Sequence, residues 1–251
     1  MPSRERSLDV LGVPVAPLDL DGAVSYLEAG LERGERVLVV TANPEFVMFA
    51  RRERALAVPS AGAGVQSLLL PDGVGLVIAA RVLGAPDFPG RARGRDLVLR
   101  LASLARHRGL SLFLLGAREG VAARAAAELR RRFPGLRVAG AYPGNAEDDG
   151  ESVARVAAAS PDILFVAYGM PKQERWLARN LSRLPSVRIA MGVGGAFDYL
   201  SGAAKLPPEW MARAGLEWLW RLVREPWRWR RQIVLPVFLV LVLRERLRLS
   251  S

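Results

Sequence analysis

Short apolar segments alternate with longer segments of helical spacing along most of this chain, and no other feature constrains the fold as much. The apolar segments are 8–15, 36–44, 66–73, 110–116, 136–142, 161–169 and 187–195, the first being typical of a strand or a hairpin. The helical segments are 18–34, 45–56, 74–84, 95–109, 120–135, 146–160 and 171–181. Strands separated by such helices form parallel sheets with right-handed crossovers. We therefore predict an α/β fold, with helices flanking a Rossmann-like parallel sheet.

This alternation stops at about residue 200. Residues 201–251 show no strand pattern, and prolines at positions 207, 208, 226 and 236 interrupt them. We therefore expect an α/β core over residues 1–200 and a helical C-terminal appendage, basic and aromatic, over residues 201–251.

The net charge of +11 predicts an anionic partner: nucleic acid, a membrane surface or a phosphorylated substrate. Arginines cluster within 91–137 and again after 213, where they alternate with tryptophans and lead into the apolar run 235–243. Tryptophan beside arginine and an apolar run favours a membrane surface over nucleic acid. That run is shorter than the about 20 residues that span a bilayer, and the N-terminal residues lack a signal-peptide pattern. We expect a cytoplasmic protein, peripheral on the inner face of the cell membrane, with no nucleic-acid partner.

The last 25 residues are the predicted membrane contact. In a helix, Val234, Val237, Phe238, Leu241 and Val242 recur at spacings of three and four, and little of the segment around them is polar. Such a helix must pack on the core, on another subunit or on lipid. The basic flanks, where Trp227 and Trp229 stand among arginines, favour lipid, so residues 227–251 are predicted to bind anionic membranes.

Several kinds of chemistry are excluded or disfavoured by residue content. The chain has no cysteine, which rules out disulfides and thiolate catalysis. The one histidine, His107, stands at an arginine-rich helix end, which is typical of a surface position. Asp19 and Asp21 have a D-x-D spacing, but they begin a predicted helix, where aspartate caps backbone N–H groups. We therefore expect no metal site and no cofactor.

Four polar motifs follow directly after predicted strands: 41–45, 71–73, 168–174 and 192–198. In a parallel sheet these strand ends share one edge, beyond which ligands bind, so the motifs predict a site there. Asp72 comes after an apolar strand and before a glycine, so it is either a turn residue or a general base whose pKa is raised by apolar surroundings. Thr41 and Asn43 either bind a sugar and orient this base, or serve as turn and N-cap residues.

The other two motifs leave similar alternatives. Gly194 and Gly195 either allow a tight turn or form a backbone cradle for a diphosphate at a helix N-terminus. Lys172 supplies a cation for a diphosphate, while Gln173 and Glu174 stand where a nucleotide or sugar hydroxyl would be held. The alternative for these three is a capping turn with a solvated lysine.

The ordered blocks TANPE, PDG, GRDL, FLLG, GMPKQE, GVGGAFD and LEWLWRL, spread over about residues 8–232, resemble those of the WecG/TagA/CpsF glycosyltransferases. The resemblance implies an inverting transferase that moves a hexose or an N-acetylhexosamine-type sugar, such as N-acetylmannosamine, from UDP to a polyprenyl-diphosphate-linked sugar. It implies work at the cytoplasmic membrane in the assembly of cell-wall polymers such as teichoic acid, or of capsule or exopolysaccharide.

The family's functional residues map onto positions of this chain. Asp72 corresponds to the expected base, Thr41 and Asn43 to the polar pair near it, and Arg91 and Gln173 to groups that bind substrate. The chain departs from the family in having Arg95 before the aspartate of GRDL and one extra residue in the preceding loop, so Arg93 could replace Arg91. With no metal expected, arginines must hold the charge of the departing UDP, and the candidates in the appendage are Arg221, Arg224, Arg228 and Arg231.

Two other functions compete with this one. A nicotinamide-dependent oxidoreductase would need G-x-G-x-x-G after the first strand and an acidic residue about 20 positions later, and neither is present. A non-catalytic basic module that binds membranes or nucleic acid would not need the polar motifs, and salt alone would govern its affinity. The donor sugar, the lipid acceptor and the formation of a homo-oligomer stay open.

Overall fold

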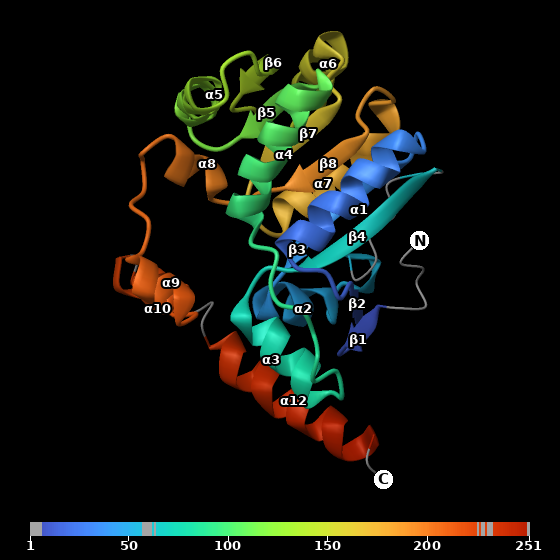
Figure 1. Ribbon diagram of the computed structural model, residues 1–251, viewed down its shortest axis with the longest axis vertical. Coiled ribbons are helices and arrows are strands. Elements are labelled where there is room, and N and C mark those ends of the chain that lie inside the picture. Colours follow the sequence, from blue (N-terminus) through green and yellow to red (C-terminus); the bar gives the residue numbers. More distant parts are fainter. Residues whose placement is uncertain are drawn as a thin grey trace.

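Six parallel strands form the main sheet of the protein (Figure 1). The computed structural model describes residues 7–56, 62, 64–224, 226, 229 and 233–249. The strand order is β4-β3-β8-β7-β5-β6. The strands are β3 (Arg36–Ala42), β4 (Val65–Pro71), β5 (Ser111–Gly116), β6 (Arg137–Tyr142), β7 (Ile163–Ala167) and β8 (Ile189–Gly192). The predicted α/β fold with a Rossmann-like parallel sheet is confirmed, and the first apolar segment is an antiparallel hairpin of β1 (Leu8–Val10) and β2 (Val13–Val15).

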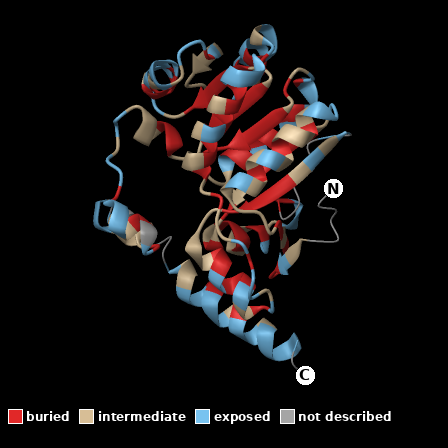
Figure 2. Cartoon of the chain, in the orientation of Figure 1, coloured by how far each residue is buried: buried red, intermediate tan, exposed pale blue. Residues whose placement is uncertain are grey.

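Helices cover both faces of this sheet, each over its own hydrophobic core. One core contains residues of α2 (Pro44–Ala50), α3 (Val74–Val82), α6 (Asp149–Ala159) and α7 (Lys172–Asn180). The other contains residues of α1 (Leu20–Glu32), α4 (Gly94–Arg108), α5 (Val121–Arg132) and α8 (Ala196–Leu200). Successive strand residues alternate between the two cores, as the pleat requires, and Figure 2 shows the strands buried between helices whose outer sides are exposed.

Local polar contacts explain where two of the helices begin. The Asp19 carboxylate accepts a hydrogen bond from the Gly22 N–H at 2.9 Å, which confirms its capping role at α1. Asp21 forms an exposed ion pair with Arg100. Asn43 caps α2 by accepting from the Phe46 N–H at 2.9 Å. Among the described residues no group of three or more His, Cys, Asp or Glu side chains is arranged to hold a metal ion.

Arg36 binds three backbone carbonyls at the amino edge of the sheet. Arg36, the first residue of β3, donates from Nε to the Val187 carbonyl at 2.9 Å. Its Nη2 donates to the carbonyls of Leu181 and Leu184, each at 2.8 Å. Leu181 begins the 3-10 turn η3 (Leu181–Arg183), so this side chain fastens the connection between α7 and β8. The amino edge is thus a structural end of the sheet, opposite the polar motifs.

The described residues beyond position 200 form helices and loops. The helices are α9 (Glu209–Arg213), α10 (Glu217–Arg224) and α12 (Val234–Leu249). In Figure 1, α12 lies alongside α3, and its Phe238 and Val242 are buried in the core that also contains α2 and α3. Its other side is exposed, including Val237, Leu239, Val240, Leu243 and Leu247. The helix prediction is therefore confirmed for 234–249, and core packing accounts for one side of it.

None of the helices in the described ranges is both long and apolar enough to cross a bilayer. Of the predicted membrane segment, Trp227 and residues 228, 230–232 and 250–251 lie outside the described residues, whereas Trp229 is described and exposed.

Candidate active site

The carboxylate of Asp72 lies at the carboxyl end of β4, where the chain turns into α3. Its backbone N–H extends the parallel ladder by donating to the Ala42 carbonyl at 2.8 Å. Its Oδ1 accepts a hydrogen bond from the Gly94 N–H, the first residue of α4, also at 2.8 Å. The backbone of Asp72 is therefore fixed by β3 and its carboxylate by the start of α4, and the side chain is only partly buried. This is a fixed acceptor at the edge of the sheet, the geometry that a general base requires.

Thr41 and Asn43 are carried to the same corner by the end of β3. Thr41 and Ala42 pair with Leu70 and Pro71 of β4, so the two strand ends lie side by side. Gly94 stands next to Thr41, since a Cβ on this glycine would lie 3.2 Å from the threonine Oγ1. Asn43 uses its Oδ1 as the cap of α2. The structure thus brings Thr41, Asp72 and Gly94 together, with Asn43 one residue beyond Ala42 in a capping role.

Two arginines before α4 and one in its first turn converge on a single carboxylate. Arg91 Nη1, Arg93 Nη1 and Arg95 Nη1 lie 3.7, 3.3 and 3.2 Å from the Glu217 carboxylate at the start of α10. Arg93 and Arg95 also pair with Asp96. The loop is placed there because the Ala92 N–H donates to the Pro71 carbonyl at 2.7 Å, two residues before the Gly94 bond to Asp72. A cationic cluster therefore adjoins the candidate base, and both Arg91 and Arg93 belong to it.

The appendage touches this corner of the sheet through further contacts. Arg91 Nη2 donates to the Ala212 carbonyl in α9. Gly215, which has a φ of +75°, packs so closely that a Cβ there would lie 2.8 Å from Val74 in the first turn of α3. Such an approach needs glycine, both for its positive φ and for the missing side chain. The sequence pattern linked residue 91 to the site but did not indicate that Glu217 would meet it.

The predicted arginines of the appendage are only partly described. Arg224 is exposed at the end of α10, with its guanidinium 4.7 Å from the centre of the Trp220 ring. The side chain of Arg221, and the whole of Arg228 and Arg231, lie outside the described part of the chain. Their part in holding the departing diphosphate stays a prediction.

The side-chain amide of Gln173, which follows the turn after β7, is hydrogen-bonded within the protein. Gln173 Oε1 accepts from the N–H groups of Gly169 and Gly194, at 3.1 and 3.0 Å, and its Nε2 donates to Glu174 Oε1 at 2.9 Å. Both side chains are buried, each 5% exposed. Burial raises the pKa of the Glu174 carboxyl. The sequence prediction that these two groups hold a substrate hydroxyl stays untested, and in this conformation neither faces solvent.

The backbone N–H groups of the two glycines after β8 differ in whether they are free to bind a ligand. The N–H of Gly194 is taken by Gln173, and the N–H of Ala196 donates to the Val193 carbonyl at 3.0 Å. Gly194 has a φ of +50°, so the tight-turn reading of this glycine is supported. A diphosphate cradle at Gly194 and Gly195 would have to use the Gly195 N–H or displace Gln173.

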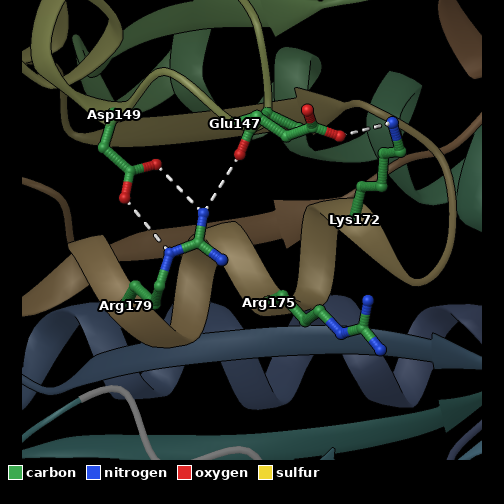
Figure 3. Close-up of a pocket in the computed structure, with 6 residues that line it drawn as sticks. Glu147, Asp149, Lys172, Arg175 and Arg179 are labelled. Carbon is green, nitrogen blue, oxygen red and sulfur yellow. Dashed lines mark hydrogen bonds and ion pairs between the residues drawn. The ribbon is translucent and has the colours of Figure 1, made fainter.

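Lys172 faces a pocket of about 350 Å³ beside α7, which Figure 3 shows. Its Nζ lies 3.2 Å from the Glu147 carboxylate. Across the pocket, Arg179 pairs with Asp149 at 3.1 Å, and Arg175 lines the wall. Lys172 is therefore separated from Asp72 by the intervening strands β3 and β8. The structure does not bring this lysine and the candidate base together.

A larger hollow of about 600 Å³ opens beyond β5 and β6. The β5–α5 connection, the end of β6, the β6–α6 connection and the first turn of α6 line it: Ala117, Glu119, Ala141, Tyr142, Pro143, Gly144, Asn145, Asp148, Glu151 and Ser152. After β5 the chain runs to β6, and after β7 it runs the opposite way to β8, so the topological switch point lies between β5 and β7. Ligands of open α/β sheets bind at such points, and the hollow borders this one on the β5 side through Ala117 and Glu119. None of these lining residues belongs to the four polar motifs from which the site was predicted.

Comparison with known proteins identifies the family of this chain. The family model described as "Glycosyl transferase WecG/TagA/CpsF family" matches residues 8–251. A protein of Bacillus spizizenii named N-acetylglucosaminyldiphosphoundecaprenol N-acetyl-beta-D-mannosaminyltransferase is 36% identical over 228 residues, which cover 90% of this chain and 86% of the relative. A protein of the same name from Bacillus subtilis is 31% identical, covering 93% of this chain and 90% of the relative. One from Staphylococcus aureus is 29% identical, covering 94% and 92%. The resemblance noted in the sequence is confirmed, and the chain belongs to the WecG/TagA/CpsF family of glycosyltransferases.

Proposed function

We propose that this enzyme transfers N-acetylmannosamine from a UDP-sugar to N-acetylglucosaminyl-diphospho-undecaprenol in the synthesis of a cell-wall polymer. The relatives that cover most of the chain carry names that describe transfer of this sugar to this lipid. The observation that carries the proposal is the corner at Asp72, where a fixed carboxylate adjoins three arginines. A glycosyl transfer with a phosphate leaving group needs one base and nearby cations.

The reaction proposed for this corner is a single displacement. Asp72 removes the proton of the acceptor hydroxyl as that oxygen attacks the anomeric carbon. The bond from the anomeric carbon to the β-phosphate oxygen breaks on the opposite side, and the electron pair leaves with UDP. Inversion of an α-linked donor then yields a β-linked product. Arg91, Arg93 and Arg95 supply positive charge for the departing diphosphate, together with the predicted appendage arginines.

We place the nucleoside of the donor in the hollow beyond β5 and β6. Its volume of about 600 Å³ lies within the range of small-molecule sites, about 300–1,000 Å³. Glu119, Asp148 and Glu151 in its wall are acceptors suited to ribose hydroxyls rather than to phosphates. The donor would then lie along the carboxyl edge, past the turns after β7 and β8, with its sugar toward Asp72. Lys172 lies off this path, in its own pocket.

A lipid-linked acceptor requires the enzyme to meet a membrane, and we assign this contact to the exposed side of α12. That side presents Val237, Leu239, Val240, Leu243 and Leu247, while Arg244, Arg246 and Arg248 follow in the last turns. Apolar side chains that enter the interface beside basic residues bind anionic leaflets, at about 1 kcal/mol for each basic residue near the surface.

Liposome flotation tests this contact. Val240→Asp and Leu243→Asp change exposed positions only, so both should fold and should no longer float with vesicles that contain anionic lipid. Ile78→Asp is the matched control, because Ile78 is an exposed apolar residue on α3 rather than α12. Flotation of the α12 variants at the wild-type level would exclude this face as the anchor.

The transferase proposal is tested by supplying a panel of UDP-sugars with a soluble N-acetylglucosaminyl-diphosphate lipid and analysing the product. We expect release of UDP and a disaccharide-linked lipid with UDP-N-acetylmannosamine, and little with the other donors. Transfer of a different sugar would retain the reaction and correct the donor. Failure to bind any UDP-sugar, with salt alone governing lipid binding, would favour the non-catalytic basic module instead.

A further inference from the structure

Two buried polar side chains begin helix α7, and the proposed chemistry does not require either of them. Gln173 and Glu174 are each 5% exposed, while Lys172 and Arg175 of the same turn face the pocket in Figure 3. Burying an amide or a carboxyl group costs free energy unless it is hydrogen-bonded. The partners of these two groups therefore indicate what the pair is for.

The amide of Gln173 joins two turns that are distant in sequence. Its oxygen accepts from the Gly169 N–H in the turn after β7 and from the Gly194 N–H in the turn after β8. Both glycines have a positive φ, +78° and +50°, so each turn is tight and directs its N–H inward. One side-chain oxygen thus satisfies two backbone donors that are 25 residues apart, 169 to 194.

The direction of this amide is determined by its neighbour. Two N–H donors face Oε1, so a reversed amide would place donor against donor. Glu174 Oε1 accepts a hydrogen bond from Nε2 at 2.9 Å, so this orientation gives both ends of the Gln173 amide a partner. The end of β8 leaves room for it, because a Cβ on Gly192 would lie 2.7 Å from Gln173 Nε2.

Glu174 is only half satisfied by this geometry. Its second oxygen, Oε2, is buried and has no hydrogen-bond partner among the described residues. A buried polar atom without a partner costs about 1–3 kcal/mol. A group retained at such a cost, beside the turns that border the proposed donor path, points to a role in the reaction rather than in folding.

We propose that Gln173 is a positioning residue that ties the turn after β7 to the turn after β8, and that Glu174 orients its amide. The inference rests on the proposed function, because these turns lie between the Asp72 corner and the hollow beyond β5 and β6. Gln173 then acts on the substrate through the spacing of the two turns, not by contact. A slip of one turn against the other would misalign the donor sugar and Asp72, and a displacement of about 1 Å costs up to about 100-fold in rate.

Hydrogen exchange of the backbone amides tests, without any substrate, whether Gln173 connects the two turns. In the wild type the Gly169 and Gly194 amides should exchange slowly. Gln173→Met, which has a similar shape and no amide, should lose protection at both glycines. Glu174→Gln keeps an acceptor for Nε2 and should retain protection, whereas Glu174→Met should lose part of it. Unchanged protection in Gln173→Met would overturn the proposal.

Steady-state kinetics with the UDP-sugar tests the link to the reaction. We expect Gln173→Met and Glu174→Met each to lower kcat/KM by about 10–100-fold, mostly through kcat. The double variant should be no worse than the worse single variant, because the two groups act as one unit. Glu174→Gln should restore nearly full activity. Additive losses, or full activity in Gln173→Met with unprotected glycines, would contradict positioning.

Stability separates this role from a merely structural one. Glu174→Met removes the unpartnered oxygen but also leaves Gln173 Nε2 without its acceptor. These two effects are each about 1–3 kcal/mol and oppose one another, so the denaturant midpoint should change little while activity falls. The matched control is Asn180→Leu at the other end of α7, where a buried amide donates to the Trp176 carbonyl, accepts from Arg183 and also hydrogen-bonds Asp149. It should lose stability and keep kcat/KM. If the wild type transfers no sugar from any donor, the proposed function fails, whereas the exchange measurement still decides the tie between the turns.

Discussion

Replacing Asp72 by asparagine should leave the fold intact and nearly abolish transfer. The asparagine oxygen can still accept the Gly94 N–H that Asp72 holds at 2.8 Å, so the connection between β4 and α4 survives. The change exchanges a charge-assisted hydrogen bond for a neutral one, a difference of about 1 kcal/mol. For a chain of this size, 1 kcal/mol lowers Tm by about 2–4 °C.

The expected catalytic loss is much larger than this change in stability. Loss of a general base costs about 10²–10⁴-fold in kcat, which is about 3–5 kcal/mol of transition-state stabilisation. The amide cannot take the acceptor proton, although it can still hold the hydroxyl in place, so KM should change little. The assay is UDP release at saturating donor, with Tm measured on the same preparation.

Asp72→Ala provides the comparison that distinguishes base from turn residue. Alanine leaves the Gly94 N–H without its acceptor, at a cost of about 1–3 kcal/mol, so it should be less stable than asparagine and equally inactive. Turnover near the wild-type level in Asp72→Asn would refute the assignment of the base. An asparagine variant that unfolds, with activity proportional to its folded fraction, would show that Asp72 is a turn residue only.

Three further predictions concern charge and metal. Transfer should persist in excess EDTA, since the D-x-D aspartate Asp19 caps α1, and loss restored by Mg²⁺ or Mn²⁺ would reveal a metal requirement. Glu217→Gln should tighten UDP binding by about 3–10-fold at low salt, as measured by calorimetry. The reason is that the substitution removes the anion that pairs with Arg91, Arg93 and Arg95. Weaker binding would mean that Glu217 aligns these arginines for the donor. Arg36→Met should destabilise the protein by about 2–4 kcal/mol in urea, because three carbonyls lose a charged donor, while the activity of the folded fraction stays unchanged.

The sheet and its polar edge were predictable because they follow from local patterns. Each strand is a buried apolar run that ends in a turn, and parallel pairing then brings those ends to one side. Thr41 and Asp72 lie together for this reason, since they end adjacent strands. The capping roles of Asp19 and Asn43 depend only on the next three residues, which is the range that sequence reasoning covers well.

Contacts across long stretches of chain were not predictable in the same way. Glu217 follows Arg91 by 126 residues, and nothing in LEWLW shows which loop its carboxylate will meet. Lys172 follows a strand, as Asp72 does, but β8 and β3 lie between β7 and β4, and the lysine side chain pairs with Glu147. A position after a strand sets the edge on which a residue lies, whereas the place of that strand in the sheet order sets its neighbours along the edge.

The GMPKQE turn shows how one pattern can serve two purposes. Polar residues at the end of a buried strand are expected to bind a ligand, because burying them otherwise costs free energy. That cost is also met when the partner is the protein's own backbone. Gln173 satisfies the Gly169 and Gly194 N–H groups that two tight turns leave without a ladder partner. A parallel sheet with a site at its carboxyl edge needs both kinds of residue: some that contact the substrate, and some that hold the turns in the positions from which the contacts are made. In the function proposed above, exposure separates the two kinds, because Asp72 remains partly open to solvent while Gln173 and Glu174 are each 5% exposed.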